Sequence, residues 1–161
     1  MTGAEPQRSA RDILRETGEA IVVGVARALP GWAEREVERI VDAWGRVDPG
    51  ALSSVGTRAR AAGAAATRRV VGELERLLAE APERQRATPL QVVRSAYREP
   101  TAVLVSLGIP PVVRDEFDER SWPDDVYGLV PHDLGALDPE LAPLHLAWGM
   151  AKARVLRERP P

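Results

Sequence analysis

Two histidines are the residues of this chain best suited to acid–base or metal chemistry. His132 lies beside Asp133, and His145 follows thirteen positions later. Two imidazoles together with carboxylates such as Glu116 or Asp125 could bind a transition metal. Their spacing is not a metal-site signature. The sequence contains neither the paired histidines of a zinc-protease helix, nor an aspartate-rich calcium loop, nor a phosphate-binding glycine loop. An enzyme or metal-binding protein that uses His132, Asp133 and nearby carboxylates is therefore an alternative, not the expected function.

Other catalytic groups lack the neighbours that they would need. Cysteine is absent, which excludes disulfides, thiolate nucleophiles and thiolate metal sites. Serines such as Ser53 and Ser95 have no local motif that would supply a base. We therefore expect a non-catalytic protein that binds no cofactor.

An acidic and aromatic segment is the most unusual feature of the sequence. Residues 115–140 hold nine acidic side chains against one arginine, and three of the chain's seven aromatic residues lie here. The three rings, Phe117, Trp122 and Tyr127, are five positions apart, a spacing that fits neither a helix nor a strand. We expect residues 111–137, approximately, to form a long irregular strap that crosses the helices.

The strap supplies the candidate partner surface. Aromatic rings bury large areas whereas unpaired carboxylates resist burial, so we expect the rings to anchor the strap and the acids to line its outer edge. Such an edge would orient a basic protein partner and speed its association. In an alternative arrangement the rings themselves are exposed and contact the partner. The candidate partner-binding residues are Asp115, Glu119, Trp122, Asp124, Asp125 and Tyr127.

Arginines gather in a different part of the chain. Residues 58–98 hold nine arginines against four glutamates. Their simplest role is to lie beneath the acidic strap, where exposed ion pairs contribute about 0–1 kcal/mol each. Binding of nucleic acid by these arginine-bearing helices is an alternative. It is disfavoured because the pI is about 5.8, lysine is nearly absent and no known nucleic-acid-binding motif is present.

The elements that must position these groups are helices, because apolar residues recur every three or four positions. Ser9 with Asp12, and Thr88 with Gln91, have the pattern of helix N-terminal capping boxes. Proline interrupts helices, so we expect breaks at Pro30-Gly31 and at Pro100. The expected helices are 9–29, 32–44, about 52–77, 89–98, 100–107, and a last one that begins near Asp138-Pro139 or Pro143.

Two helical faces are suited to contact with another helix. Gly56, Ala59, Gly63 and Ala66 would allow a close approach, and a symmetric homodimer through this small-residue face is one expectation. The last helix carries an apolar seam for packing on a neighbour. The seam consists of Leu141, Leu144, Trp148, Ala151 and Val155.

Length and composition indicate a single domain with a hydrophobic core, and the helical periodicity indicates its class. With 161 residues, 44% of them hydrophobic, the chain is expected to be all-α: a single-domain bundle of five or six helices over residues 9–157. Residues 1–8 are expected to be flexible and residues 158–161 to fray. The longest apolar run, residues 20–26, is far below the roughly 20 residues that span a bilayer, so we expect a cytoplasmic protein with no membrane contact. The excess of arginine over lysine indicates a GC-rich bacterial genome. We expect a protein–protein interaction or regulatory module.

Overall fold

The structure, a computed structural model, describes residue 3 and residues 6–111 and 122–158. Within these residues all regular elements are helical, which confirms the all-α class. The α-helices are α1 (Ala10–Trp44), α2 (Pro49–Ala79), α3 (Pro89–Arg94), α4 (Arg98–Ser106) and α5 (Ala142–Arg157). Short 3-10 helices are η1 (Ser95–Tyr97), η2 (Leu134–Ala136) and η3 (Pro139–Leu141).

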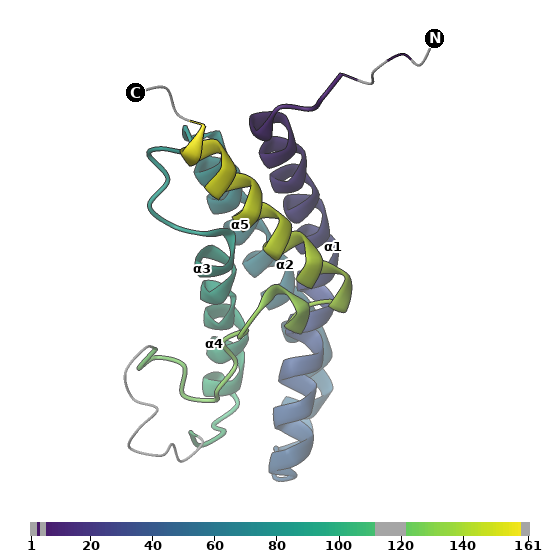
Figure 1. The fold of residues 1–161 in the computed structure, drawn as a ribbon. Coiled ribbons are helices and arrows are strands. Elements are labelled where there is room, and N and C mark those ends of the chain that lie inside the picture. Colours follow the sequence, from purple (N-terminus) through teal and green to yellow (C-terminus); the bar gives the residue numbers. More distant parts are fainter. Residues whose placement is uncertain (1–2, 4–5, 112–121, 159–161) are drawn as a thin grey trace.

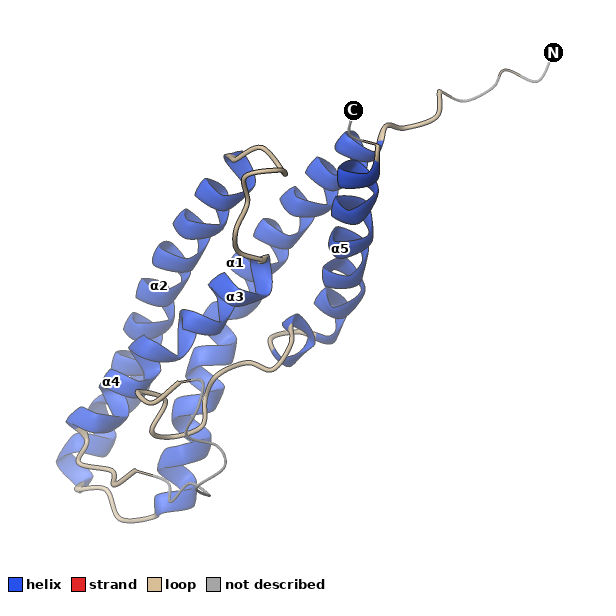
Figure 2. Ribbon diagram, turned by 60° about the vertical axis from the view of Figure 1, so that its left-hand side comes forward, coloured by secondary structure: helices blue, strands red, loops and turns tan. Residues whose placement is uncertain are grey.

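A long hairpin of α1 and α2 forms the centre of the molecule (Figure 1). The two helices are antiparallel, because Gly18 of α1 meets Leu78 of α2 while Pro30 meets Gly63. In Figure 2, α3 and α4 follow one another along α2, and α5 lies against the first half of α1. The chain returns from α4 to α5 through the strap.

Two hydrophobic clusters hold these layers together, one at each end of the hairpin. The first, which we call the α5 cluster, joins the first half of α1, the second half of α2, α3 and α5, with Ile21, Val70 and Trp148 among its members. The second, the strap cluster, joins the other halves of α1 and α2 to α4 and the strap. Its buried members are Val37, Ile40, Val41, Val55, Ala59, Ala62, Tyr97, Val103, Leu104, Ile109, Tyr127 and Leu129.

The expected break at Pro30-Gly31 is wrong, because α1 continues without interruption to Trp44. A proline inside a helix removes one hydrogen bond and crowds the preceding turn. Here Leu29 and Ala33, on either side of it, are fully buried, so both halves of the helix are held against the core. Packing of the apolar face thus outweighs the local cost of the proline.

The expected break at Pro100 is also misplaced. The helix tightens earlier, over η1, and Pro100 lies in the first turn of α4. Amides of a first helical turn have no partner within the helix, so a proline there loses no hydrogen bond. With α1 unbroken and α3, η1 and α4 in direct succession, the expected number of five or six separate helices was slightly off.

Local helix signals and the apolar seam of the last helix are confirmed. Ser9 caps α1, and Thr88 with Gln91 forms a complete capping box at the start of α3. Leu141, Trp148 and Val155 are buried against the rest of the molecule. The seam therefore packs within the chain.

The small-residue face of α2 also packs within the chain. A Cβ atom added at Gly63 would lie 2.9 Å from the carbonyl oxygen of Pro30, and Ala59 and Ala66 are fully buried. These small residues allow α2 to approach α1 closely at the proline. Ala59, Gly63 and Ala66 are therefore buried within the chain and are not exposed to a second copy of it.

Candidate functional site

The strap folds around the side chain of Asp125. Its carboxylate accepts hydrogen bonds from the backbone amides of Leu129 at 2.6 Å and Val130 at 3.0 Å. Gly128 has a φ of 67°, a left-handed conformation that turns the chain back toward the carboxylate. Residues 122–130 of the strap therefore form a loop that its own hydrogen bonds stabilise.

The expectation that Asp125 lies on the outer edge is wrong, since only 4% of the residue is exposed. A buried carboxylate is tolerated where hydrogen bonds replace its hydration, and two backbone amides do so here. Asp124, the preceding residue, is exposed. Asp115, Glu119 and the expected anchor Phe117 lie outside the described residues.

Tyr127 anchors the strap, as predicted. The side chain is buried in the strap cluster, and its hydroxyl donates a 2.5 Å hydrogen bond to the carbonyl of Ile109, beyond the end of α4. Burial raises the pKa of Tyr127 above its ordinary value. The ring fixes residues 122–130 to the helices and is not available to a partner.

Trp122 is half-buried against the strap cluster and is held by an arginine of α3. The guanidinium carbon of Arg94 lies 5.3 Å from the centre of the indole ring. The same guanidinium donates a 3.2 Å hydrogen bond to the carbonyl of His132. Arg94 of α3 therefore binds the strap through the Trp122 ring and the His132 carbonyl group.

Other arginines of residues 58–98 connect the helices to one another. Arg69 of α2 forms two hydrogen bonds with the Glu99 carboxylate of α4, at 2.6 and 2.9 Å, and two more with Ser95. The hydrogen bonds to Glu99 raise the pKa of Arg69 above its ordinary value. Arg60 lies 3.5 Å from Glu34 of α1, and Arg58 bonds to the hydroxyl of Ser106. These contacts leave fewer arginines to bind phosphates.

Neither histidine belongs to a group of described side chains that could bind a metal ion. His132 is exposed, and Asp133 accepts a 2.9 Å hydrogen bond from the amide of Ala136, which caps η2. His145 is half-buried on α5. Among the residues that the structure describes, no three histidine, aspartate or glutamate side chains gather closely enough to hold a metal ion.

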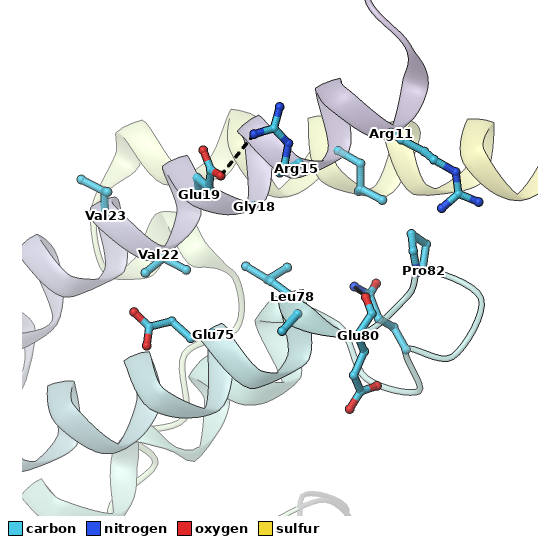
Figure 3. A pocket seen from close by; sticks show the side chains of 13 residues that line it. Arg11, Arg15, Gly18, Glu19, Val22, Val23, Glu75, Leu78, Glu80 and Pro82 are labelled. Atoms are coloured by element: carbon cyan, nitrogen blue, oxygen red, sulfur yellow. Dashed lines mark hydrogen bonds and ion pairs between the residues drawn. The ribbon is translucent and has the colours of Figure 1, made fainter.

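A groove that sequence analysis missed runs between the first half of α1 and the last turns of α2 (Figure 3). It has a volume of about 630 Å³. Its apolar lining includes Leu14, Gly18 and Val22 of α1, with Leu78 of α2 opposite. A Cβ atom at Gly18 would lie 3.1 Å from Leu78, so the glycine sets the depth of the floor.

The groove is missed by pattern analysis because its two walls are about sixty residues apart in the sequence. Only a weak signal exists: Val23 is an apolar residue that lies off the buried seam of α1. It is 56% exposed, at the edge of the groove.

Charged side chains surround the apolar floor, and most of them form ion pairs. Arg15 lies 3.8 Å from Glu19, as Figure 3 shows, and Arg11 pairs with Glu83 of the loop after α2. Glu75 and Glu80 are exposed and form no ion pair with another described residue. The uncompensated charge around the groove is therefore negative.

Comparisons with protein-family models, with curated proteins and with solved structures found no match. None of the described helices combines the length and the hydropathy that crossing a lipid bilayer requires.

Proposed function

We propose that this chain is a non-catalytic protein-binding module, and that the groove between α1 and α2 receives a helical segment of a basic partner. The observation that supports this most is the open apolar groove with an exposed Val23 at its edge and uncompensated carboxylates beside it. Helical partner segments bind such grooves through apolar side chains spaced three or four residues apart.

The character of the lining favours binding over catalysis. Its titratable side chains are two arginines and the glutamates Glu19, Glu75 and Glu80, with no histidine, serine or tyrosine beside them. Its apolar floor gives a partner side chain a desolvated contact, which is where most binding energy arises at interfaces. Glu75 and Glu80 would attract arginine or lysine beside that apolar side chain.

The strap provides a second contact surface for the same basic partner. Asp124 is exposed, and Trp122 is half-exposed beside it. Asp125 and Tyr127 support this surface from beneath and do not touch the partner.

A defined peptide tests the proposal. The probe is a helical peptide of about 16 residues with leucines four positions apart and arginines next to them, compared with a version carrying glutamates instead. We expect the basic peptide to bind, with NMR shift changes at Val22, Val23 and Leu78. Val23→Glu should weaken binding by about tenfold or more because it places a charge in the apolar contact.

Val105 of α4 offers a matched control, because it is 58% exposed and Val23 is 56% exposed. Val105→Glu should leave binding unchanged. Glu75→Arg should slow association at low salt, and Asp124→Asn should slow it to a smaller extent because it removes one charge of the second contact surface. Equal binding of both peptides, or equal effects of the two valine variants, would refute the groove as the site. Binding of a single-stranded oligonucleotide that is lost in Arg84→Ala and Arg86→Ala would support the nucleic-acid alternative.

A further inference from the structure

Helix α5 is apolar on two sides, and only one side is covered. Its inner seam packs on the α5 cluster, whereas Leu146 is 67% exposed and Met150 is 65% exposed. These are the two most exposed large apolar residues of the described chain. Contiguous exposed apolar surface is typical of an interaction site, whereas singly scattered apolar residues are not.

The outer side of α5 forms a continuous stripe without charge until its last turn. Lys152 is turned inward, with its amino group 5.0 Å from the centre of the Trp148 ring, and Arg154 pairs with Glu158 at 2.9 Å. Spacings of three and four place the stripe along one side of the helix. The exposed residues of the stripe are Ala142, Leu146, Gly149, Met150, Ala153 and Arg157.

The order of side chains in this stripe is complementary to itself in the reverse direction. When a second α5 lies antiparallel, with the symmetry axis between residues 149 and 150, Leu146 meets Ala153 and Met150 meets Gly149. Each large side chain thus lies opposite a small one, which is the arrangement that lets two helices interlock. A parallel pair would place Leu146 against Leu146 and leave Gly149 against Gly149.

The charge at the end of the stripe supports the same direction. Arg157 lies opposite Ala142 in the antiparallel pair, whereas a parallel pair would place Arg157 against Arg157. Arg157 is exposed and forms no ion pair with another described residue. The antiparallel direction therefore keeps two uncompensated positive charges apart.

A hollow beside the stripe completes the fit. It has a volume of about 440 Å³ and lies between α5 and the start of α1, where Ala10 and Ile13 face Met150 and Ala153. The partner subunit's Leu146, placed over Ala153, lies at the mouth of this hollow. A surface with both a projecting leucine and a recess for it is what a two-fold symmetric interface requires.

We propose that the chain forms a symmetric homodimer through antiparallel packing of α5 on α5, centred between Gly149 and Met150. This interface shares no residue with the α1–α2 groove, so the dimer can exist whether or not the groove binds a partner.

Because the chain has no cysteine, one introduced thiol tests whether α5 lies against α5 in the dimer. A Cβ atom at Gly149 meets nothing within 4 Å, so Gly149→Cys fits the monomer and puts two sulfurs close together across the symmetry axis. We expect it to form a disulfide-linked dimer under mild oxidation. Val105→Cys is the control on α4, and it should stay monomeric under denaturing electrophoresis. Linking of both variants at equal rates would overturn the proposal.

Sedimentation of the unmodified chain provides the second measurement. We expect a dimer at micromolar concentration, and Leu146→Asp should convert it to a monomer while the melting temperature at low concentration stays unchanged, because Leu146 is exposed. Ala142→Glu should strengthen the dimer, because it places a carboxylate opposite Arg157 in the antiparallel pair. A monomer at all concentrations, or a monomer that floats with phosphatidylserine vesicles through α5, would overturn the proposal.

Discussion

The Asp125 carboxylate accepts a 2.6 Å hydrogen bond from the backbone amide of Leu129, four residues further along the strap. The strap is therefore closed on itself by one of its own acidic side chains. Asp124 and Asp125 are adjacent and identical in chemistry, yet one is exposed and the other is buried. An acidic sequence thus serves both the internal structure of the loop and its outer surface.

The two aspartates should respond differently to the same substitution. Asp125→Asn places an NH₂ group against backbone amides that need an acceptor, and should lower the free energy of unfolding by about 1–3 kcal/mol. Asp124→Asn should change it by less than about 0.5 kcal/mol. Urea denaturation of both variants gives the comparison, and an equal loss would mean that the buried carboxylate is not held as described.

Two glycines of α2 should respond to alanine with opposite signs. Gly63→Ala brings a methyl group 2.9 Å from the Pro30 carbonyl oxygen, a backbone atom that cannot move aside, and should cost about 1–3 kcal/mol. At Gly72 a Cβ atom would meet nothing within 4 Å, so Gly72→Ala should stabilise by about 0.5–1 kcal/mol. Thermal melts test both, and a stabilising Gly63→Ala would show that the helices are further apart.

Arg69 should contribute more to stability than its neighbour Arg68. Arg69→Met removes both hydrogen bonds to Glu99 and leaves that carboxylate without its cation, at a cost of about 1.5–3 kcal/mol. Arg68 is exposed, so Arg68→Met should be nearly neutral. Arg69→Lys should recover only part of the loss, because an ammonium group cannot form the paired contact. Coincident denaturation curves of Arg68→Met and Arg69→Met would contradict this difference in stability.

Tyr127 should make stability fall at high pH. Its folded-state pKa is raised above the ordinary value of 10.0 by burial, so at higher pH the unfolded chain loses the proton before the folded chain does. Stability is thus retained below pH 10 and decreases as pH rises beyond it. In Tyr127→Phe the free energy of unfolding should fall less over this pH range, because the titrating hydroxyl is gone. Urea denaturation of both proteins at pH 8 and at about pH 10.5 measures the difference. Because all other groups titrate in both proteins, an identical decrease in the free energy of unfolding would contradict the contribution of Tyr127.

Local signals predicted much of this fold. The Thr88 and Gln91 side chains determine the start of α3 whatever surrounds them, and the seam from Leu141 to Val155 needs only helical periodicity to be recognised. Tyr127 as an anchor followed from the cost of leaving a large ring in water.

Features that depend on a distant segment could not be predicted in this way. The continuity of α1 at Pro30 depends on packing against the next helix, where Gly63 allows the close approach. Burial of Asp125 depends on the turn at Gly128, and nothing in the pair of aspartates indicates which of them points inward. The groove depends on Gly18 facing Leu78, a contact that periodicity along one helix does not contain.

The division of the core into two clusters also sets an order in which the protein can fold during synthesis. Every member of the strap cluster has been made once residue 130 has left the ribosome. The α5 cluster contains both Ala10 and Val155, so the part of α1 that packs on α5 stays uncovered until the last helix has been made. Contacts of such large sequence separation form late, because closing a long loop has a high entropic cost. The newly made chain therefore exposes the α5-facing side of α1 until translation is almost complete.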